Sequence, residues 1–223
     1  AIDIRAPHFV MYVKKYLAEK YGEAVAAQGG LKVTTTLDLD VQETAQKIVK
    51  DNIDKLKGYR VSNSAVLVTK PKTGEILAMV GSRDFFDTSI DGNVNVTVAQ
   101  RQPGSSIKPA TYATAFKTGF SPGNTILDAP VSFKDGSRDY SPVNYDGGFH
   151  GPVSIRVALG SSYNVPAVKM LATVGIVEMI KTAQDLGITT FEDLSRFGLS
   201  LTLGGGEVKM IDMMAMYGSF ARM

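Results

Sequence analysis

The amino-acid sequence predicts a mixed α/β (α+β) fold in which helices flank a short antiparallel hairpin. Residues 65–69 and 75–80 are β-rich runs, and the five residues between them contain the proline and glycine that are typical of a hairpin connection. Both runs are apolar at nearly every position, so we expect helices to cover both faces of the sheet. Apolar residues at helical spacing on either side of the hairpin indicate those helices.

The composition is that of a chain able to bury a core. Of its 223 residues, 44% are hydrophobic and 21% are charged, which excludes global disorder. A net charge of +2 gives no indication of a nucleic-acid partner. Cysteine is absent, which excludes disulfides and thiol catalysis. Since His8 and His150 lie far apart and form no zinc-ligand pattern, we expect neither a metal nor another cofactor.

The first 60 residues predict a small helix–strand–helix unit. Helical spacing covers residues 9–21, with Gly29-Gly30 as the stop, and period-two alternation over residues 31–37 predicts a strand. Asp40 and Glu43 resemble a capping box at the start of a second helix that continues to Gly58.

After the hairpin, loops and helices alternate. We expect loops over residues 81–104 and from about residue 118 to residue 152, and a loop as long as the second one is more often functional than idle. The expected helices cover residues 106–117, 154–159, 165–174, 177–186 and 210–223.

The chemistry is concentrated in residues 102–109, with the sequence QPGSSIKP. Ser105 and Lys108 are three residues apart, so on a helix they share one face. Pro103-Gly104 places Ser105 at a helix start, beside unpaired backbone N–H groups. A serine needs an adjacent base to act as a nucleophile, and a lysine can be that base if burial lowers its pKa. The alternative is that Ser105 only caps the helix and that Lys108 is a solvated side chain.

A second polar triplet, Ser162-Tyr163-Asn164, precedes Pro166. Because the proline interrupts a helical pattern, we expect the triplet to lie in a bend between two helical pieces. There the Ser162 hydroxyl can relay a proton, while the Asn164 amide can bind a substrate carbonyl and steady the lysine. The alternative is an ordinary helix–loop–helix corner in which both side chains satisfy backbone groups.

These S-x-x-K and S-x-N motifs, in this order, resemble those of the class A, bifunctional penicillin-binding proteins. Further blocks that resemble the family follow the family's order along the chain. They are residues 6–10, 29–38, 73–81, 101–109, 142–146 and 203–205.

The resemblance implies the penicillin-recognising serine transpeptidase fold, an antiparallel sheet flanked by helices. It also implies D,D-transpeptidation, in which peptidoglycan stem peptides ending in D-Ala-D-Ala are cross-linked through an acyl-serine, and acylation of the same serine by β-lactams. By the same resemblance Ser105 is the nucleophile, Lys108 its base, and Ser162 and Asn164 form the second motif.

The third motif of the family, K-[ST]-G, follows S-x-N, whereas both K-T-G triplets of this chain, residues 72–74 and 117–119, precede it. We interpret both as turns, residues 1–60 as a linker segment, and residues 61–223 as the N-terminal part of a transpeptidase domain truncated before the third motif. The complete protein is then expected at the extracytoplasmic face of a bacterial membrane, held by an upstream anchor. We expect the chain alone to be inactive, and to pair with its missing C-terminal segment or with a glycosyltransferase domain.

Three alternatives stay open from the sequence. A serine β-lactamase would also hydrolyse its acyl-enzyme, but no E-x-x-L-N segment follows the S-x-N triplet. A β-lactam sensor would stay acylated, although its second motif usually has valine where this chain has Asn164. A non-catalytic interaction module would not be acylated at all.

Overall fold

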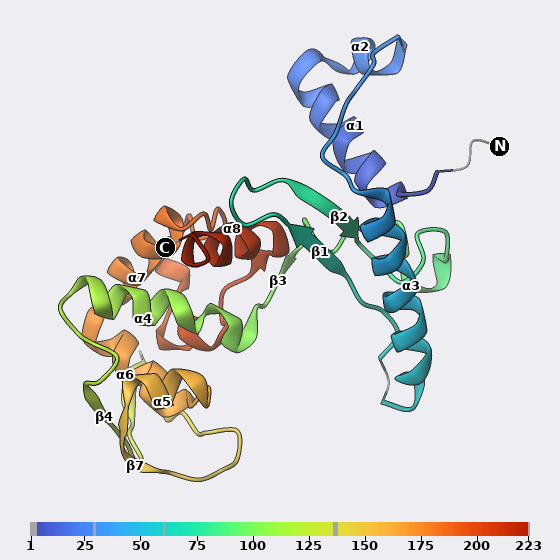
Figure 1. Ribbon diagram of the computed structural model, residues 1–223. Helices are drawn as coiled ribbons and strands as arrows, with labels where there is room; N and C mark the ends of the chain where they lie inside the picture. The colour runs from blue at the N-terminus through green and yellow to red at the C-terminus, as the bar shows by residue number, and fades with distance from the viewer. Residues whose placement is uncertain (1–3, 29, 60, 136–137, 223) are drawn as a thin grey trace. The chain divides into compact units, whose positions relative to one another are not determined.

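The structure is a computed structural model that describes residues 4–28, 30–59, 61–135 and 138–222. The chain forms two compact units, one within residues 1–99 and 209–223 and the other within residues 100–208. Both units contain helices and strands (Figure 1), and the strand pairs with an assigned register are antiparallel. The predicted α/β (α+β) class with antiparallel sheet and flanking helices is confirmed.

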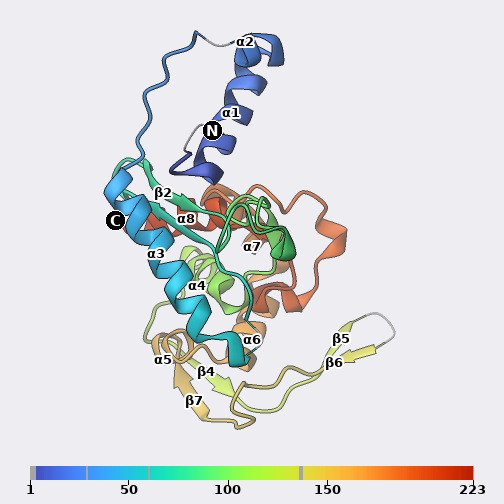
Figure 2. The same cartoon turned by 90° about the vertical axis from the view of Figure 1, so that its right-hand side faces the viewer.

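The first unit is built on the predicted hairpin. Strands β1 (Val66–Thr69) and β2 (Ile76–Val80) pair antiparallel, and successive side chains point to opposite faces. On one face Ala78 and Val80 pack against helix α3 (Leu39–Lys55). On the other face Leu67 and Met79 pack against residues of helices α1 (Pro7–Tyr21) and α8 (Met210–Phe220), so the hairpin lies between α3 and α8 (Figures 1 and 2). The expectation that both faces are covered is correct.

The predicted strand over residues 31–37 is wrong, since this segment is irregular and largely exposed. Only its end reaches β2, where Thr36 Oγ1 donates to Ile76 O at 2.7 Å and Asp38 N donates to Leu77 O at 3.0 Å. The next position on the free edge of β2 is bound by a side chain. Gln42 accepts from Met79 N at 2.7 Å and donates to Met79 O at 3.1 Å. A residue of α3 thus takes the place of a neighbouring strand.

Two helix boundaries also differ from the prediction. Helix α1 ends at Tyr21 because Gly22 adopts a φ of +89°, and helix α2 (Glu23–Gln28) follows; Gly29 of the predicted stop lies outside the described residues. Helix α3 is capped by Asp38, which accepts from the backbone of Asp40 and of Val41 at 3.1 Å each, and not by a box starting at Asp40. The expected partner of that box, Glu43, instead accepts a hydrogen bond from Arg5.

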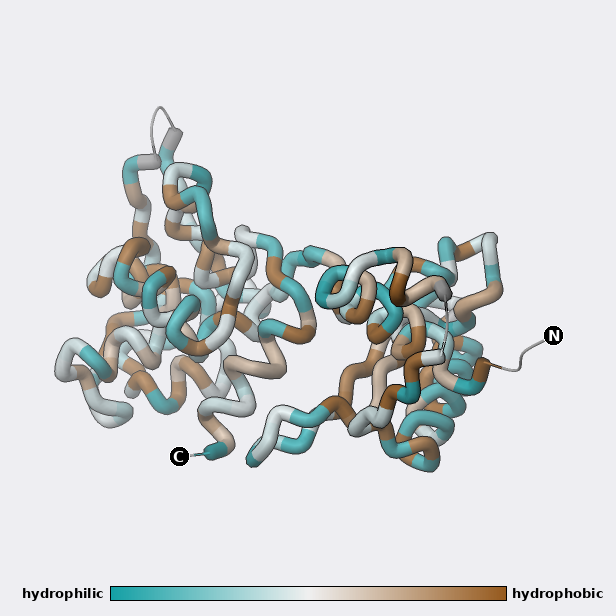
Figure 3. The backbone as a smooth tube through the Cα atoms, turned by 90° about the horizontal axis from the view of Figure 1, so that it is seen from above, coloured by the Kyte–Doolittle hydropathy of each residue, from teal (hydrophilic) through white to brown (hydrophobic). Residues whose placement is uncertain are grey.

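The second unit contains four helices in the expected places. They are α4 (Lys108–Lys117), α5 (Ile155–Gly160), α6 (Asn164–Val174) and α7 (Ile176–Asp185). Buried side chains of α4, α5 and α6, among them Tyr112, Ile155 and Met170, form one apolar core. Figure 3 shows hydrophobic and hydrophilic residues alternating along the chain, as amphipathic elements require.

The expectation of a loop without strands over residues 118–152 is wrong. Strand β4 (Thr125–Asp128) pairs with β7 (Gly151–Ser154), and β5 (Phe133–Asp135) pairs with β6 (Arg138–Tyr140). These strands are short and the partners of the first pair are far apart in sequence, so no local alternation marks them. The long connection therefore contains two antiparallel strand pairs, with β5–β6 lying in sequence between β4 and β7.

In the described part of the chain, no helix is long and apolar enough to cross a membrane. The remaining elements of the structure are short. Strands β3 (Gln100–Arg101) and β8 (Val208–Lys209) form a further pair. The 3-10 helices are η1 (Lys57–Tyr59), η2 (Thr88–Ile90), η3 (Gly104–Ile107), η4 (Leu194–Arg196) and η5 (Leu199–Leu203). Helix α8 ends at Phe220, and Met223 of the predicted range lies outside the described residues.

Candidate active site

Lys108 is the centre of the candidate site. It is the first residue of α4, with Pro109 in the first turn, where a missing N–H does no harm. The residue is only 1% exposed. Its Nζ donates to Ser162 O at 2.6 Å, to Asn164 Oδ1 at 2.8 Å and to Ser162 Oγ at 3.1 Å. The second unit therefore brings three of the four predicted site residues together by direct hydrogen bonds.

Burial lowers the pKa of Lys108 from its ordinary value of 10.5 to about 8. The cause is desolvation, which disfavours the ammonium, while the three oxygen acceptors favour it and hold the charged form in place. A lysine with this pKa has a sizeable neutral fraction near neutral pH. Such an amine can accept a proton from a neighbouring hydroxyl, whereas an ordinary surface lysine cannot.

Ser105 lies in η3, the 3-10 turn that leads directly into α4, as the Pro103-Gly104 approach predicts. The backbone N–H of Lys108 donates to Ser105 O, which closes that turn. In a 3-10 turn, residues three apart lie on the same side, so Ser105 and Lys108 share one face. The Ser105 side chain is exposed, and its hydroxyl makes no hydrogen bond with Lys108 Nζ among the interactions of the described residues.

Ser162 and Tyr163 of the S-x-N triplet lie in the bend between α5 and α6, as predicted, while Asn164 is already the first residue of α6, which continues through Pro166. Ser162 has a φ of +56°, a left-handed conformation that is uncommon for a residue with a side chain. In this conformation its carbonyl and hydroxyl oxygens both lie within hydrogen-bond distance of Lys108 Nζ. Backbone strain of this kind is typical of functional sites.

A glycine near the end of the second unit's sequence packs closely against the turn that contains Ser105. Gly204, which follows η5 at a φ of +94°, lies so near Gly104 that an added Cβ would stand 2.3 Å from Gly104 N and 2.5 Å from its Cα. Only glycine allows both this φ and this approach. The glycine-rich segment 204–206, for which the sequence gives no phosphate-binding context, thus has a packing reason beside Ser105.

We expect Gly204→Ala to lower the free energy of unfolding by about 2 kcal/mol or more, because backbone strain and overpacking add. The matched control is Gly218→Ala in α8, where an added Cβ meets open space and a helical alanine should stabilise the protein by about 0.5–1 kcal/mol. Denaturant midpoints of the two variants measure the difference. A midpoint for Gly204→Ala at or above that of the unchanged protein would contradict the close packing.

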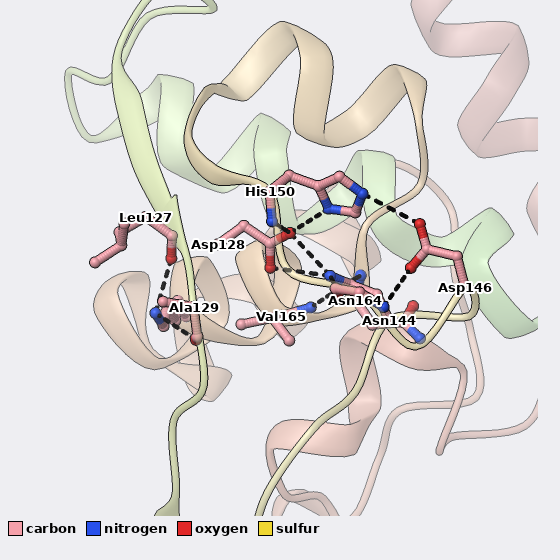
Figure 4. Close-up of polar contacts among 10 residues, drawn as sticks. Leu127, Asp128, Ala129, Asn144, Asp146, His150, Asn164 and Val165 are labelled. Atoms are coloured by element: carbon pink, nitrogen blue, oxygen red, sulfur yellow. Dashed lines mark hydrogen bonds and ion pairs between the residues drawn. The ribbon is translucent and has the colours of Figure 1, made fainter.

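Behind the bend lies a polar network that the sequence does not single out as a site (Figure 4). Its centre is Asp128, the last residue of β4, which is fully buried and accepts hydrogen bonds from Asn144 and His150. Asn144 and His150 follow Asp128 by 16 and 22 positions, and the β4–β7 pairing places Asp128 opposite Gly151, next to His150. The signal for this network in the sequence is the family-like block at residues 142–146, which contains Asn144.

The geometry agrees with what comparison with known proteins shows. The family model of the penicillin-binding protein transpeptidase domain matches residues 64–203, more than half of the chain and all four predicted site residues. The chain belongs to this family. Among the described residues no three histidine, aspartate or glutamate side chains are grouped so as to hold a metal ion.

Curated relatives of this transpeptidase-family chain are class A penicillin-binding proteins. Penicillin-binding protein 2D of Bacillus subtilis is 32% identical over 97% of the chain and 31% of its own length. Penicillin-binding protein 1C of Escherichia coli is 34% identical over 86% of the chain and 24% of its own length. The chain therefore spans about a third or less of the length of these relatives.

Solved structures show the same fold. Penicillin-binding protein 1A of Haemophilus influenzae has a TM-score of 0.83 at 21% identity, over 98% of this chain and 46% of that one. The PonA1 protein of Mycobacterium tuberculosis in complex with penicillin V has a TM-score of 0.80 at 23% identity, over 96% of this chain and 58% of that one. The predicted resemblance to class A penicillin-binding proteins and to their fold is confirmed.

Proposed function

We propose that this chain is the N-terminal part of a peptidoglycan D,D-transpeptidase that works through an acyl-serine and is acylated by β-lactams. The observation that supports the proposal most directly is the buried Lys108 amine, held by Ser162 and Asn164 one 3-10 turn after the exposed Ser105 hydroxyl. A buried amine of lowered pKa on the same face as an exposed serine hydroxyl is an arrangement that suits nucleophilic catalysis.

In the proposed reaction, Ser105 Oγ attacks the carbonyl carbon between the two D-alanines of a stem peptide. The neutral Lys108 amine takes the hydroxyl proton, the C–O ester bond forms and the C–N amide bond breaks. The departing D-alanine amine takes up a proton, for which the Ser162 hydroxyl, 3.1 Å from Lys108 Nζ, is a suitable relay. An amine of a second stem peptide then attacks the ester, forms the cross-link and returns Ser105 to its hydroxyl form.

The proposal extends to the surroundings of the site. Residues 1–60 serve as a linker segment and residues 61–223 as the N-terminal part of the transpeptidase domain. The protein acts at the extracytoplasmic face of a bacterial membrane, together with a membrane anchor, a glycosyltransferase domain and a C-terminal segment that carries the K-[ST]-G motif. The proposal is supported by the greater length of the relatives, since the chain spans only 31% and 24% of penicillin-binding proteins 2D and 1C.

Labelled penicillin tests the function on the full-length product of the gene that contains this chain. A stable, stoichiometric adduct together with release of D-alanine from a stem peptide ending in D-Ala-D-Ala is the expected result. Rapid turnover of the adduct would indicate a β-lactamase, and a stable adduct without D-alanine release would indicate a sensor. No adduct would indicate an interaction module and would contradict the proposal.

We expect residues 1–223 expressed alone to acylate at least a hundredfold more slowly than the full-length protein. No K-[ST]-G triplet follows Asn164 in these residues, and loss of a single oxyanion-hole donor typically costs about 10²–10³ in rate. Sedimentation of the same sample checks whether the fragment associates with itself. A soluble monomer that acylates at the full-length rate would contradict this expectation and would show that Ser105, Lys108, Ser162 and Asn164 suffice.

A further inference from the structure

The buried carboxylate of Asp128 is the centre of a polar network next to the S-x-N bend (Figure 4). Its two oxygens lie 3.0 and 2.8 Å from Asn144 Nδ2, and one of them also accepts from His150 N at 3.0 Å and from His150 Nδ1 at 2.6 Å. A carboxylate with no exposed surface is tolerated only when it is well hydrogen-bonded or paired. Asp128 thereby fixes the orientation of both Asn144 and His150.

Asn144 connects Asp128 to the first turn of helix α6 by hydrogen bonds. Its Oδ1 accepts from the backbone N–H of Asn164 at 2.8 Å and of Val165 at 3.2 Å. These are first-turn donors that have no partner within a helix, and Tyr163 at the N-cap position supplies no side-chain acceptor. Asn144, twenty residues upstream, therefore performs the capping function from a different segment.

Asn164, whose backbone N–H is bound by Asn144, is also a hydrogen-bond acceptor for Lys108. Asn164 Oδ1 accepts from Lys108 Nζ at 2.8 Å, while Asn164 Nδ2 donates to Val143 O at 2.9 Å. Neighbouring residues of one segment thus fix the backbone of Asn164 through Asn144 and the plane of its amide through Val143. A continuous path of hydrogen bonds runs from Asp128 through Asn144 and Asn164 to Lys108.

His150 holds the middle residue of the triplet. Its ring stacks on Tyr163 with centroids 4.0 Å apart and planes 13° apart. Its Nδ1 and Nε2 lie 2.6 Å from Asp128 and 3.1 Å from Asp146, and two nitrogens facing two carboxylates are satisfied together only in the imidazolium. The hydrogen bond to Asp128 raises the pKa of His150, and burial opposes the shift.

We propose that Asp128, Asn144 and His150 are positioning residues for acyl transfer, which set the S-x-N bend so that Asn164 and Ser162 hold the amine of Lys108 for Ser105. This inference rests on the proposed function, in which Lys108 is the base. The alternative is that the network only stabilises the fold. The positioning role predicts a changed acylation rate and pH midpoint in a variant that still folds, whereas a purely stabilising role predicts no change.

The test uses Asn144→Ala in the full-length protein, with Asn124→Ala as the matched control. Asn124 is an exposed asparagine of the same unit whose side-chain Oδ1 accepts from Ser121 N at 2.6 Å, and no hydrogen bond within the described part of the chain joins its side chain to Asn164. We expect Asn144→Ala to slow the acylation step by labelled penicillin about ten- to a hundredfold, the usual effect of a misplaced catalytic group, with little change in the binding step. Asn124→Ala should stay within twofold of the unchanged protein.

Two further readouts separate positioning from stability. In Asn144→Ala the pH midpoint of acylation should shift, because a displaced Asn164 changes both the burial that lowers the pKa of Lys108 and the set of acceptors that favours its charged form. Amide hydrogen exchange at Asn164 and Val165 should speed up whether or not the protein reacts with penicillin, so a failure of the proposed function leaves the cap testable. Asp128→Asn, which keeps the size of the buried group, should show the same changes in weaker form.

Folded Asn144→Ala and Asp128→Asn proteins with wild-type acylation rates and pH midpoints would overturn the proposal, as would unchanged exchange at the start of α6. If Asn144→Ala fails to fold, Asp128→Asn decides. If both fail to fold, the network belongs to the stability of the unit and the proposal is wrong. If the unchanged protein itself is not acylated, the proposed function fails, and this inference fails with it as a statement about catalysis.

Discussion

Ser105→Ala is expected to abolish covalent labelling by β-lactams while leaving the fold intact. The residue is exposed at the surface of the 3-10 turn before α4, so the loss of its hydroxyl creates no cavity. Without Oγ no ester can form, and labelled penicillin followed on a denaturing gel should show no adduct.

Ser106→Ala is the matched control for that experiment. Ser106 is the next residue of the same turn and is equally exposed, but its hydroxyl donates to the backbone of Pro103 at 2.6 Å and is held by the turn itself. We expect this variant to be labelled to full stoichiometry. Residual stoichiometric labelling of Ser105→Ala would show that the nucleophile is elsewhere.

The second large effect is expected at Lys108. Removal of a general base typically costs about 10²–10⁴ in rate, so Lys108→Ala should slow acylation by that factor. Lys108→Arg should fail as well, because a guanidinium does not lose its proton in this pH range. Acylation of Lys108→Arg at the wild-type rate would exclude Lys108 as the base.

The pH dependence of acylation in the unchanged protein follows from the same residue. The lowered pKa of about 8 means that the neutral amine is the minor form below pH 8 and the major form above it. The rate should therefore fall about tenfold per pH unit as pH drops below 8, and it should level off above that value. A profile that is flat between pH 6 and pH 9, measured as the acylation rate constant, would contradict a titrating amine at this site.

Features set by neighbouring residues could be predicted from the sequence. The apolar runs and the turn between them predict the β1–β2 hairpin, and the full apolar character of both runs predicts cover on both faces. The spacing of Ser105 and Lys108 and the proline after Asn164 place both motifs correctly at a helix start and in a bend. Each of these features is determined by residues that lie close together in the sequence.

Features set by distant residues could not be predicted. Residues 31–37 alternate as a strand would, but in the described structure only the end of this segment meets β2, through hydrogen bonds of Thr36 and of the following Asp38 and through packing of Leu37. The β4–β7 pair joins segments separated by two further strands, and Asp128 at the end of β4 is fully buried. The network of Asp128 and Asn144 behind the S-x-N bend is therefore visible only in three dimensions.

One measurement tests the central claim most directly, namely which atom of the full-length protein β-lactams acylate. After reaction with penicillin and digestion by trypsin, the adduct mass should lie on the peptide that covers residues 102–117, because Pro109 blocks cleavage after Lys108. Fragmentation of that peptide should place the adduct on Ser105 and not on Ser106. An adduct on any other residue, or an unmodified peptide 102–117 in a protein that is stoichiometrically labelled, would contradict the account.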